Sequence, residues 1–179
     1  TTICLAYSMP RILISPTHAL LGLLLRGDRY GYELKRLVDQ EFAPYWQIDF
    51  AQLYRSLAKM TAAGWVETRI EPGAGAPDRK VYSLTEPGRQ ALKQWLAEPA
   101  KHREEYFVKV RLATEAGVSI KHLTETQRRA LEDDRLKRLN ANQSAKVAGD
   151  TSRIILTNAA LRETEASLAA LDLVDAVTP

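Results

Sequence analysis

Residues 49–57 read DFAQLYRSL and have the pattern of a helix start. Asp49 and Gln52 have the spacing of a capping box, in which both side chains bond backbone N–H groups that the first helical turn leaves unpaired. The pattern predicts a helix that begins after Asp49 and runs to Gly64. Apolar residues recur along it at three- and four-residue spacing and predict an inward face. The members of that face are Phe50, Leu53, Tyr54, Leu57 and Met60.

The opposite face of this helix is polar and cationic. Its members are Gln52, Arg55, Ser56 and Lys59. No acidic residue occurs from Phe50 to Val66, so the face favours an anionic partner. The alternative is an ordinary solvated helix surface.

Two shorter helices are predicted before this one. Residues 17–26, THALLGLLLR, form a compact apolar helix that ends at Gly27, where glycine can close a helix in the left-handed conformation. Residues 33–42 follow with helical spacing of apolar residues, and Pro44 ends that helix. Three short helices with tight connections are typical of a helix-turn-helix.

The sequence pattern changes from helical to alternating after Gly64. Strand-like residues flank the segment PGAGAP at residues 72–77, which predicts a β-hairpin, and Arg79 and Lys80 lie on its returning strand. Thr85 then caps an amphipathic helix that closes the unit. A helix-turn-helix with a basic hairpin is a winged helix, in which one helix enters the major groove of DNA and the hairpin reaches the adjacent backbone.

Three segments of the first half resemble one family, the PadR-like transcriptional regulators. They are HALLGLLLRGDRYGYEL at residues 18–34, LYRSLAKMTAAGWVE at residues 53–67 and RKVYSLTEPGRQAL at residues 79–92. The resemblance implies a homodimeric, often ligand-responsive repressor, or in some branches an activator, from the branch with a long C-terminal helical domain. The chain departs from the family pattern at Arg55, where relatives often have proline, and at Asp78 beside the basic pair of the hairpin.

The expected fold is mainly α, a winged helix-turn-helix domain followed by an all-helical dimerisation domain. The predicted division is a tail at 1–15, a winged-helix DNA-binding domain at 16–98, a linker at 99–103 and a helical dimerisation domain at 104–179. Met9 is a candidate natural start, and residues 1–8 are given no function.

Three helices are predicted in the second half. The first covers residues 103–116, with Glu105 and Lys109 paired at four-residue spacing. Thr124 and Gln127 predict a capping box that opens a long helix ending at Gly149. The last helix carries an apolar row that needs a partner helix from the same chain, from a second copy or from both. That row is Ile154, Leu161, Leu168 and Leu171. The resemblance implies a dimer interface there.

A symmetric dimer implies double-stranded DNA with an inverted repeat as the partner, because two recognition helices occupy successive major grooves about 34 Å apart. Gln52, Arg55 and Ser56 are placed to read base edges, and Lys59, Arg79 and Lys80 to hold phosphates. Tyr54 has its ring in the inward row, with a hydroxyl within reach of the DNA backbone.

Composition supports these interpretations only weakly. The chain has 179 residues and a net charge of +3, and its pI is about 9.0. Residues 16–98 hold eleven Lys and Arg against ten Asp and Glu. This near-neutral balance motivates the alternative of a winged-helix adaptor that binds protein and not DNA. The single Cys4 and the absence of a secretory signal or a long apolar run predict a cytoplasmic protein.

Catalysis, cofactors and metal sites are not expected. His18, His102 and His122 have no carboxylate or cysteine at ligand spacing, and no catalytic triad or phosphate-binding glycine loop occurs. Aromatic residues near the domain junction are candidates for a pocket that binds a small aromatic effector, with ordinary core packing as the alternative. They are Trp95, Tyr106 and Phe107.

Overall fold

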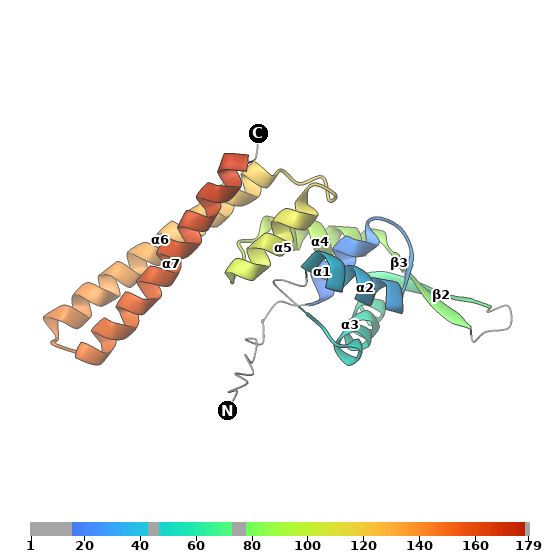
Figure 1. The fold of residues 1–179 in the computed structure, drawn as a ribbon, viewed down its shortest axis with the longest axis horizontal. Helices are drawn as coiled ribbons and strands as arrows, with labels where there is room; N and C mark the ends of the chain where they lie inside the picture. Colours follow the sequence, from blue (N-terminus) through green and yellow to red (C-terminus); the bar gives the residue numbers. More distant parts are fainter. Residues whose placement is uncertain (1–15, 43–46, 73–77, 178–179) are drawn as a thin grey trace, which may run out of the picture.

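The computed structural model describes residues 16–42, 47–72 and 78–177. The predicted tail at 1–15, Pro44 as a helix end and most of the predicted hairpin tip at 73–77 lie outside the described residues. The elements follow in the order α1 (Pro16–Leu24), β1 (Arg29–Tyr30), α2 (Gly31–Phe42), α3 (Phe50–Ala62), β2 (Val66–Glu71), β3 (Arg79–Leu84), α4 (Glu86–Ala97), α5 (Arg103–Ala113), α6 (Ile120–Val147) and α7 (Thr151–Val177) (Figure 1).

The first half is the expected winged helix. α1, α2 and α3 pack together beside an antiparallel sheet with strand order β1-β3-β2. The hairpin of β2 and β3 is confirmed, with Val66 opposite Leu84 and Glu71 opposite Arg79. Strand β1 was not predicted, because its two residues are too short to show a period. Its Tyr30 pairs with Val81, which attaches the start of α2 to the middle of the sheet.

α1 lies at the centre of the core. Its residues Ala19, Leu20 and Leu21 are fully buried, and α3, α4 and α5 all pack against this helix. α5 approaches closely at Gly22, where an added Cβ would lie 2.5 Å from a methyl group of Leu112. The glycine therefore lets α5 dock on the winged helix, although α5 comes after the predicted linker.

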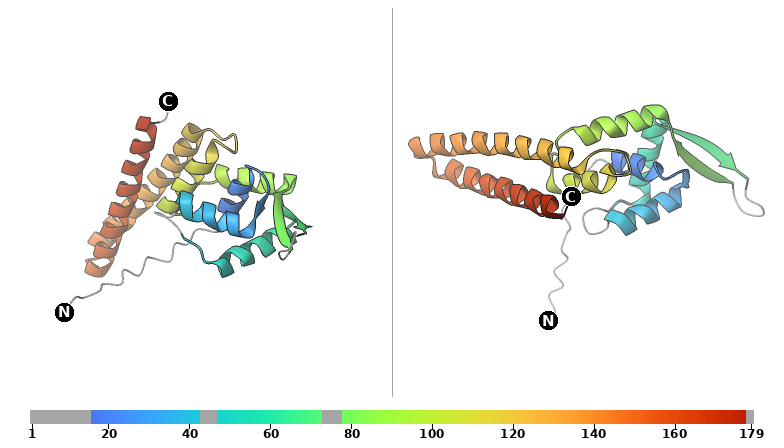
Figure 2. Two further views of the ribbon diagram at one scale, coloured as in Figure 1. Left: turned by 45° about the vertical axis from the view of Figure 1, so that its right-hand side comes forward. Right: turned by 90° about the horizontal axis from the view of Figure 1, so that it is seen from above.

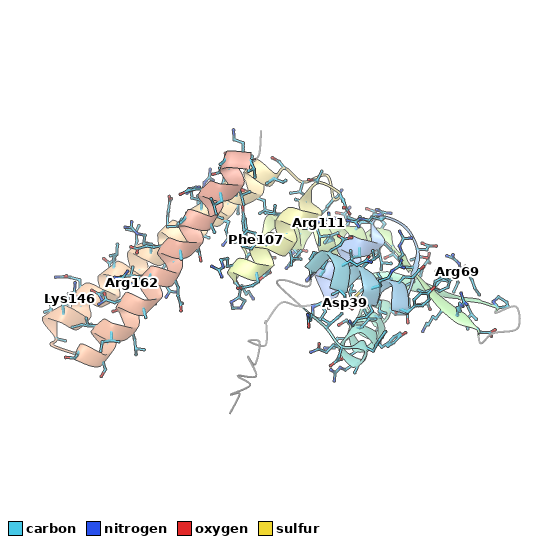
Figure 3. All side chains as sticks on the ribbon, in the orientation of Figure 1. Asp39, Arg69, Phe107, Arg111, Lys146 and Arg162 are labelled. Atoms are coloured by element: carbon cyan, nitrogen blue, oxygen red, sulfur yellow. The ribbon has the colours of Figure 1, made fainter. Side chains whose placement is uncertain are left out.

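Four charged residues reinforce this docking. Arg26 bonds both Glu41 and Glu115, and Arg111 reaches the same two carboxylates at 2.7 and 2.8 Å. The hydrogen bond from Arg26 lowers the pKa of Glu115. Figure 3 shows Arg111 on α5 next to the winged helix. The ring of alternating charges ties α5 to α2 and to the residues after α1.

The predicted capping box at Thr124 and Gln127 is wrong. α6 begins earlier, at Ile120, and Ser119 caps it by accepting a bond from the N–H of His122. Thr124 and Gln127 are buried inside the helix: the first bonds the hydroxyl of Tyr106 at 2.8 Å, and the second bonds both backbone groups of Ala100. The two polar residues attach α6 to α5 and to the linker.

α6 and α7 form a long antiparallel hairpin that extends away from the winged helix (Figures 1 and 2). Leu161 and Leu171 of the predicted apolar row are buried against the rest of the chain, whereas Ile154 and Leu168 are half-buried. Other large apolar residues of α7 are exposed, namely Ile155, Leu156, Leu173 and Val177. Within the described ranges, no helix combines the length and hydropathy needed to cross a membrane.

Candidate nucleic-acid interface

α3 begins with the predicted capping box. The N–H of Gln52 donates to Oδ1 of Asp49 at 2.6 Å, and the N–H of Asp49 donates back to Oε1 of Gln52 at 3.4 Å. Leu53, Leu57 and Met60 are fully buried. The helix is therefore fixed at its start by hydrogen bonds and along its inner face by core packing.

The predicted inward face of α3 is wrong at two positions and the outward face at one. Phe50 is 52% exposed and Tyr54 is 47% exposed, whereas Ser56 is only 6% exposed. Ser56 lies between the buried turns of Leu53 and Met60, and its hydroxyl donates to the carbonyl oxygen of Gln52 at 2.9 Å. A small side chain bonded to its own helix fits there, and the larger aromatic rings turn outward.

The remaining polar residues of α3 face solvent. Arg55 and Lys59 are exposed and Gln52 is half-buried. In the part of the chain that the structure describes, neither cation forms an ion pair. Their charges are available to an anionic partner.

The hairpin carries a second pair of available cations. Arg79 and Lys80 on β3 are exposed, and each lies 5.7 Å from the centroid of a tyrosine ring, Tyr30 and Tyr82 respectively. Arg69 on the neighbouring strand is instead paired with Asp28 and Glu71. Within residues 47–72 and 78–177, the free cations of the hairpin therefore lie on β3.

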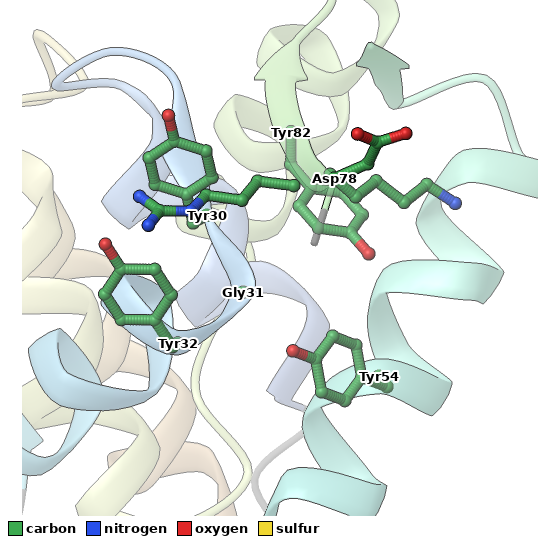
Figure 4. A pocket seen from close by; sticks show the side chains of 8 residues that line it. Tyr30, Gly31, Tyr32, Tyr54, Asp78 and Tyr82 are labelled. Atoms are coloured by element: carbon green, nitrogen blue, oxygen red, sulfur yellow. The ribbon is translucent and has the colours of Figure 1, made fainter. Parts of the chain in front are cut away.

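A cleft of about 500 Å³ lies between the start of α2, the outer side of α3 and β3. We call it the tyrosine cleft, because Tyr30, Tyr32, Tyr54 and Tyr82 line it (Figure 4). Sequence reasoning missed it, since these tyrosines come from four separate elements, β1, α2, α3 and β3. Of these four tyrosines, the sequence analysis assigns only Tyr54 to the interface.

Gly31 explains how two sequence motifs meet in this cleft. A Cβ at Gly31 would lie 2.8 Å from both Cε1 and the hydroxyl oxygen of Tyr54. The tyrosine of α3 therefore packs directly on the backbone at the start of α2. Gly31 and Tyr54 belong to two of the segments that resemble the PadR-like family, residues 18–34 and 53–67. In the fold, these two segments meet at the contact between Gly31 and Tyr54.

Trp95, one candidate for effector binding, belongs to the core. It is 8% exposed, its ring stacks on His18 with centroids 5.0 Å apart, and its Nε1 donates to Glu105 at 2.9 Å. The ammonium of Lys109 lies 4.6 Å from the centroid of the indole ring and donates to the carbonyl oxygens of Trp95 and Glu98 at 2.6 Å. Burial lowers the pKa of Lys109.

Among the described residues, the pocket that contains Tyr106 is lined by neither Trp95 nor Phe107. Tyr106 is buried and Phe107 is half-buried. Tyr106 lines a cavity of about 50 Å³ between the linker, α6 and α7. A cavity that holds benzene has about 150 Å³. The space at this junction is therefore too small for an aromatic ring.

Fold and site define a winged-helix protein with a cationic helix and a cationic hairpin on one surface. Sequence comparison shows which family the first half of the chain resembles. Residues 20–94 match the transcriptional regulator PadR-like family. The probable transcriptional regulator Rv1176c of Mycobacterium tuberculosis is 38% identical over 82 residues, which are 46% of this chain and 43% of that protein. The negative transcriptional regulator PadR of Bacillus subtilis is 30% identical over 96 residues, 51% of this chain and 53% of that protein. Residues 20–94 are therefore similar to the PadR-like transcriptional regulators.

The chain spans about half the length of the curated relatives that it matches. Solved structures superpose loosely along more of the chain. Bacillus subtilis PadR in complex with operator DNA has a TM-score of 0.45 at 22% identity and covers 89% of this chain and 94% of that one. The protein smu.1604c from Streptococcus mutans has a TM-score of 0.47 at 17% identity and covers 91% and 99%. The likeness to PadR-like regulators rests on the sequence match of residues 20–94.

Proposed function

We propose that the protein is a homodimeric regulator that binds an inverted repeat in double-stranded DNA and represses a nearby operon. One observation carries the proposal. Arg55 and Lys59 on α3 and Arg79 and Lys80 on β3 are exposed and have no carboxylate partner in the described residues. Unpaired cations complement the negative charge of the DNA backbone. A helix beside a hairpin has the shape that fits the major groove and the adjacent backbone. The name of the Bacillus subtilis relative, a negative regulator, supports repression.

The contacts divide by their position on α3 and β3. Gln52 and Arg55 lie on the outer side of the first turns of α3 and read base edges. Lys59, one turn further along, and Arg79 and Lys80 on the hairpin hold phosphates. Ser56 is left out of the interface because it is buried and bonded to its own helix.

Two copies associate through the α6–α7 hairpin in this proposal. Leu161 and Leu171 already pack within the chain, so the apolar surface left for a second copy is the exposed side of α7. Ile155 is 63% exposed, Leu156 69% and Leu173 72%. Large apolar side chains exposed to water favour burial against a partner. A two-fold axis would then place two α3 helices on one inverted repeat.

Release of the DNA by a small aromatic effector stays a prediction. The cavity beside Tyr106 is smaller than the space that an aromatic ring needs. An effector there would have to favour a conformation with a wider junction. Screening phenolic and cationic aromatic compounds for release of bound DNA tests this part separately.

The proposal is tested by selecting duplexes from a random pool and titrating the selected duplex and a scrambled one over a series of salt concentrations. We expect the selected duplex to bind at least about 10³-fold more tightly, with log K falling linearly against log salt for both. Equal binding of the two duplexes, together with a stable protein partner in pull-downs, would favour the adaptor alternative.

A further inference from the structure

The tyrosine cleft contains hydroxyl groups that nothing in the described fold uses. Tyr32 is 51% exposed and Tyr54 is 47% exposed, and no hydrogen-bond partner reaches either hydroxyl from residues 16–42, 47–72 or 78–177. Tyr30 differs, because its hydroxyl donates to Oε2 of Glu71, a bond that raises its pKa. In Figure 4, Tyr32 and Tyr54 lie on opposite sides of Gly31. The cleft therefore offers two hydroxyl donors that are held in place and available to a ligand.

The charges around the cleft favour an anion. Arg79 and Lys80 line it, and each is held over a tyrosine ring. Two acids among the described residues contact Tyr30, and both already have partners. Glu71 accepts from the hydroxyl of Tyr30 and is paired with Arg69, and Glu33 accepts from the N–H of Tyr30. Asp78 is the acidic member of the lining, and its carboxylate points away from the hydroxyls of Tyr32 and Tyr54 in Figure 4.

The chemistry of the donors indicates which anion fits. Phosphate oxygens only accept hydrogen bonds, and proteins hold DNA phosphates mainly with Arg, Lys and hydroxyl side chains such as Tyr. A cationic ligand in an aromatic cage is a poorer match, because the rings of Tyr30 and Tyr82 already face Arg79 and Lys80.

The place of the cleft indicates the source of the phosphate. Tyr54 belongs to α3 and Arg79 to β3, so the cleft lies between the helix assigned to the major groove and the hairpin assigned to the backbone. A DNA strand that passes from one to the other crosses the mouth of the cleft.

We propose that the tyrosine cleft seats one backbone phosphate of the DNA, with Tyr32 and Tyr54 donating their hydroxyls and Arg79 supplying the charge. The inference rests on the proposed function. It adds Tyr32, from the start of α2, to the interface and places the hydroxyls of Tyr32 and Tyr54 on the same backbone phosphate. It also gives Gly31 a role, because the absence of a side chain there sets the position of the Tyr54 ring.

The experiment combines Tyr→Phe variants with DNA in which single phosphates are replaced by neutral methylphosphonates. Tyr32→Phe and Tyr54→Phe should each weaken binding of the selected duplex about 10- to 150-fold, the range for a lost hydrogen bond to a charged group. At the seated phosphate, methylphosphonate should weaken the wild type but have much less effect on these two variants. At other phosphates, wild type and variants should lose affinity alike.

Tyr30→Phe is the matched control, because its hydroxyl is bonded to Glu71 and should show no coupling to any phosphate. Thermal unfolding of all three variants confirms that the fold is kept. Wild-type affinity in Tyr32→Phe and Tyr54→Phe, or the absence of a coupled position, would overturn the inference while leaving DNA binding intact. Failure of the wild type to prefer the selected duplex would instead count against the proposed function.

Inorganic phosphate titrated without DNA separates the two sources of the anion. We expect no saturable change in the tyrosine ring signals by NMR at phosphate concentrations that leave DNA binding unaffected. Tight binding of free phosphate that depends on Tyr32 and Tyr54 would assign the cleft to a free anion and overturn the assignment to the DNA backbone.

Discussion

At the residue scale, Gly31 shows how one missing side chain positions another. Its backbone is in contact with the ring of Tyr54, and a Cβ would lie 2.8 Å from that ring. We expect Gly31→Ala to destabilise the fold by about 1–3 kcal/mol, because the ring must move or the helices must separate. Urea unfolding measures this cost.

The control for Gly31→Ala uses the same substitution in a Tyr54→Ala background. With the ring gone the cost should disappear, because alanine is a better helix former than glycine. An equal cost in both backgrounds would show that Tyr54 is not the reason for the glycine.

His18 is expected to make the fold sensitive to mild acid. Burial, with the nearby positive charge of Lys109, lowers its pKa below the ordinary value, against the opposing effects of Glu105 and Glu98. Its Nδ1 has no hydrogen-bond partner in the described residues. The unfolded chain therefore takes up a proton first as the pH falls, so stability is full above about pH 6.5 and decreases through the lowered pKa.

His18→Phe keeps a flat ring against Trp95 and removes this titration. Urea unfolding at about pH 7.5 and about pH 5.5 should show a smaller acid-side loss for the variant than for the wild type. Identical losses in both proteins would mean that other groups carry the pH dependence.

At the scale of the element, the start of α3 was predictable and its faces were only partly so. Asp49 and Gln52 act within four residues, so their pattern is visible in the sequence. The outward turn of Tyr54 depends on Gly31, and the burial of Ser56 depends on the neighbouring helices. The capping box predicted at Thr124 and Gln127 was wrong for the same reason, because these side chains bond Tyr106 and Ala100. Contacts between distant segments cannot be read from local spacing.

The cap of α3 supports both stability and the proposed interface. Asp49→Ala should cost about 0.5–2 kcal/mol in urea unfolding, and it should also weaken DNA binding, because Gln52 and Arg55 lie in the first turns of the helix. Ser119→Ala, which removes the cap of α6, is the matched control. It should cost stability but leave DNA affinity unchanged, and equal losses of affinity would contradict the role given to α3.

At the scale of the whole molecule, the winged helix and the α6–α7 hairpin lie at opposite ends (Figure 1). The sequence predicted both parts and left open whether the apolar row of the last helix packs on the same chain, on a second copy or on both. The family resemblance implied a dimer interface there, whereas Leu161 and Leu171 are buried within the chain. A heptad row shows that a partner helix is needed and does not show which helix it is. The exposed residues Ile155, Leu156 and Leu173 are the ones we assign to the second copy.

Leu156→Glu tests that assignment, because the side chain is 69% exposed and the fold should tolerate the change. We expect the dissociation constant of the dimer, measured by sedimentation, to rise at least about tenfold, since burial of a leucine contributes about 1.5–3 kcal/mol. Ile70→Glu on β2, also 69% exposed, should leave the dimer unchanged. Dimers of equal strength in both variants would place the interface elsewhere.

The most direct test of the interface measures the affinity of wild type, Arg55→Ala and Arg79→Ala for the selected and the scrambled duplex. We predict that wild type prefers the selected duplex and that Arg55→Ala loses about 1–3 kcal/mol of that preference. Arg79→Ala should weaken both duplexes alike and reduce the salt slope by about 1. Equal binding of both duplexes by the wild type, or the same pattern of loss in both variants, would contradict a recognition helix that reads bases beside a hairpin that holds phosphates.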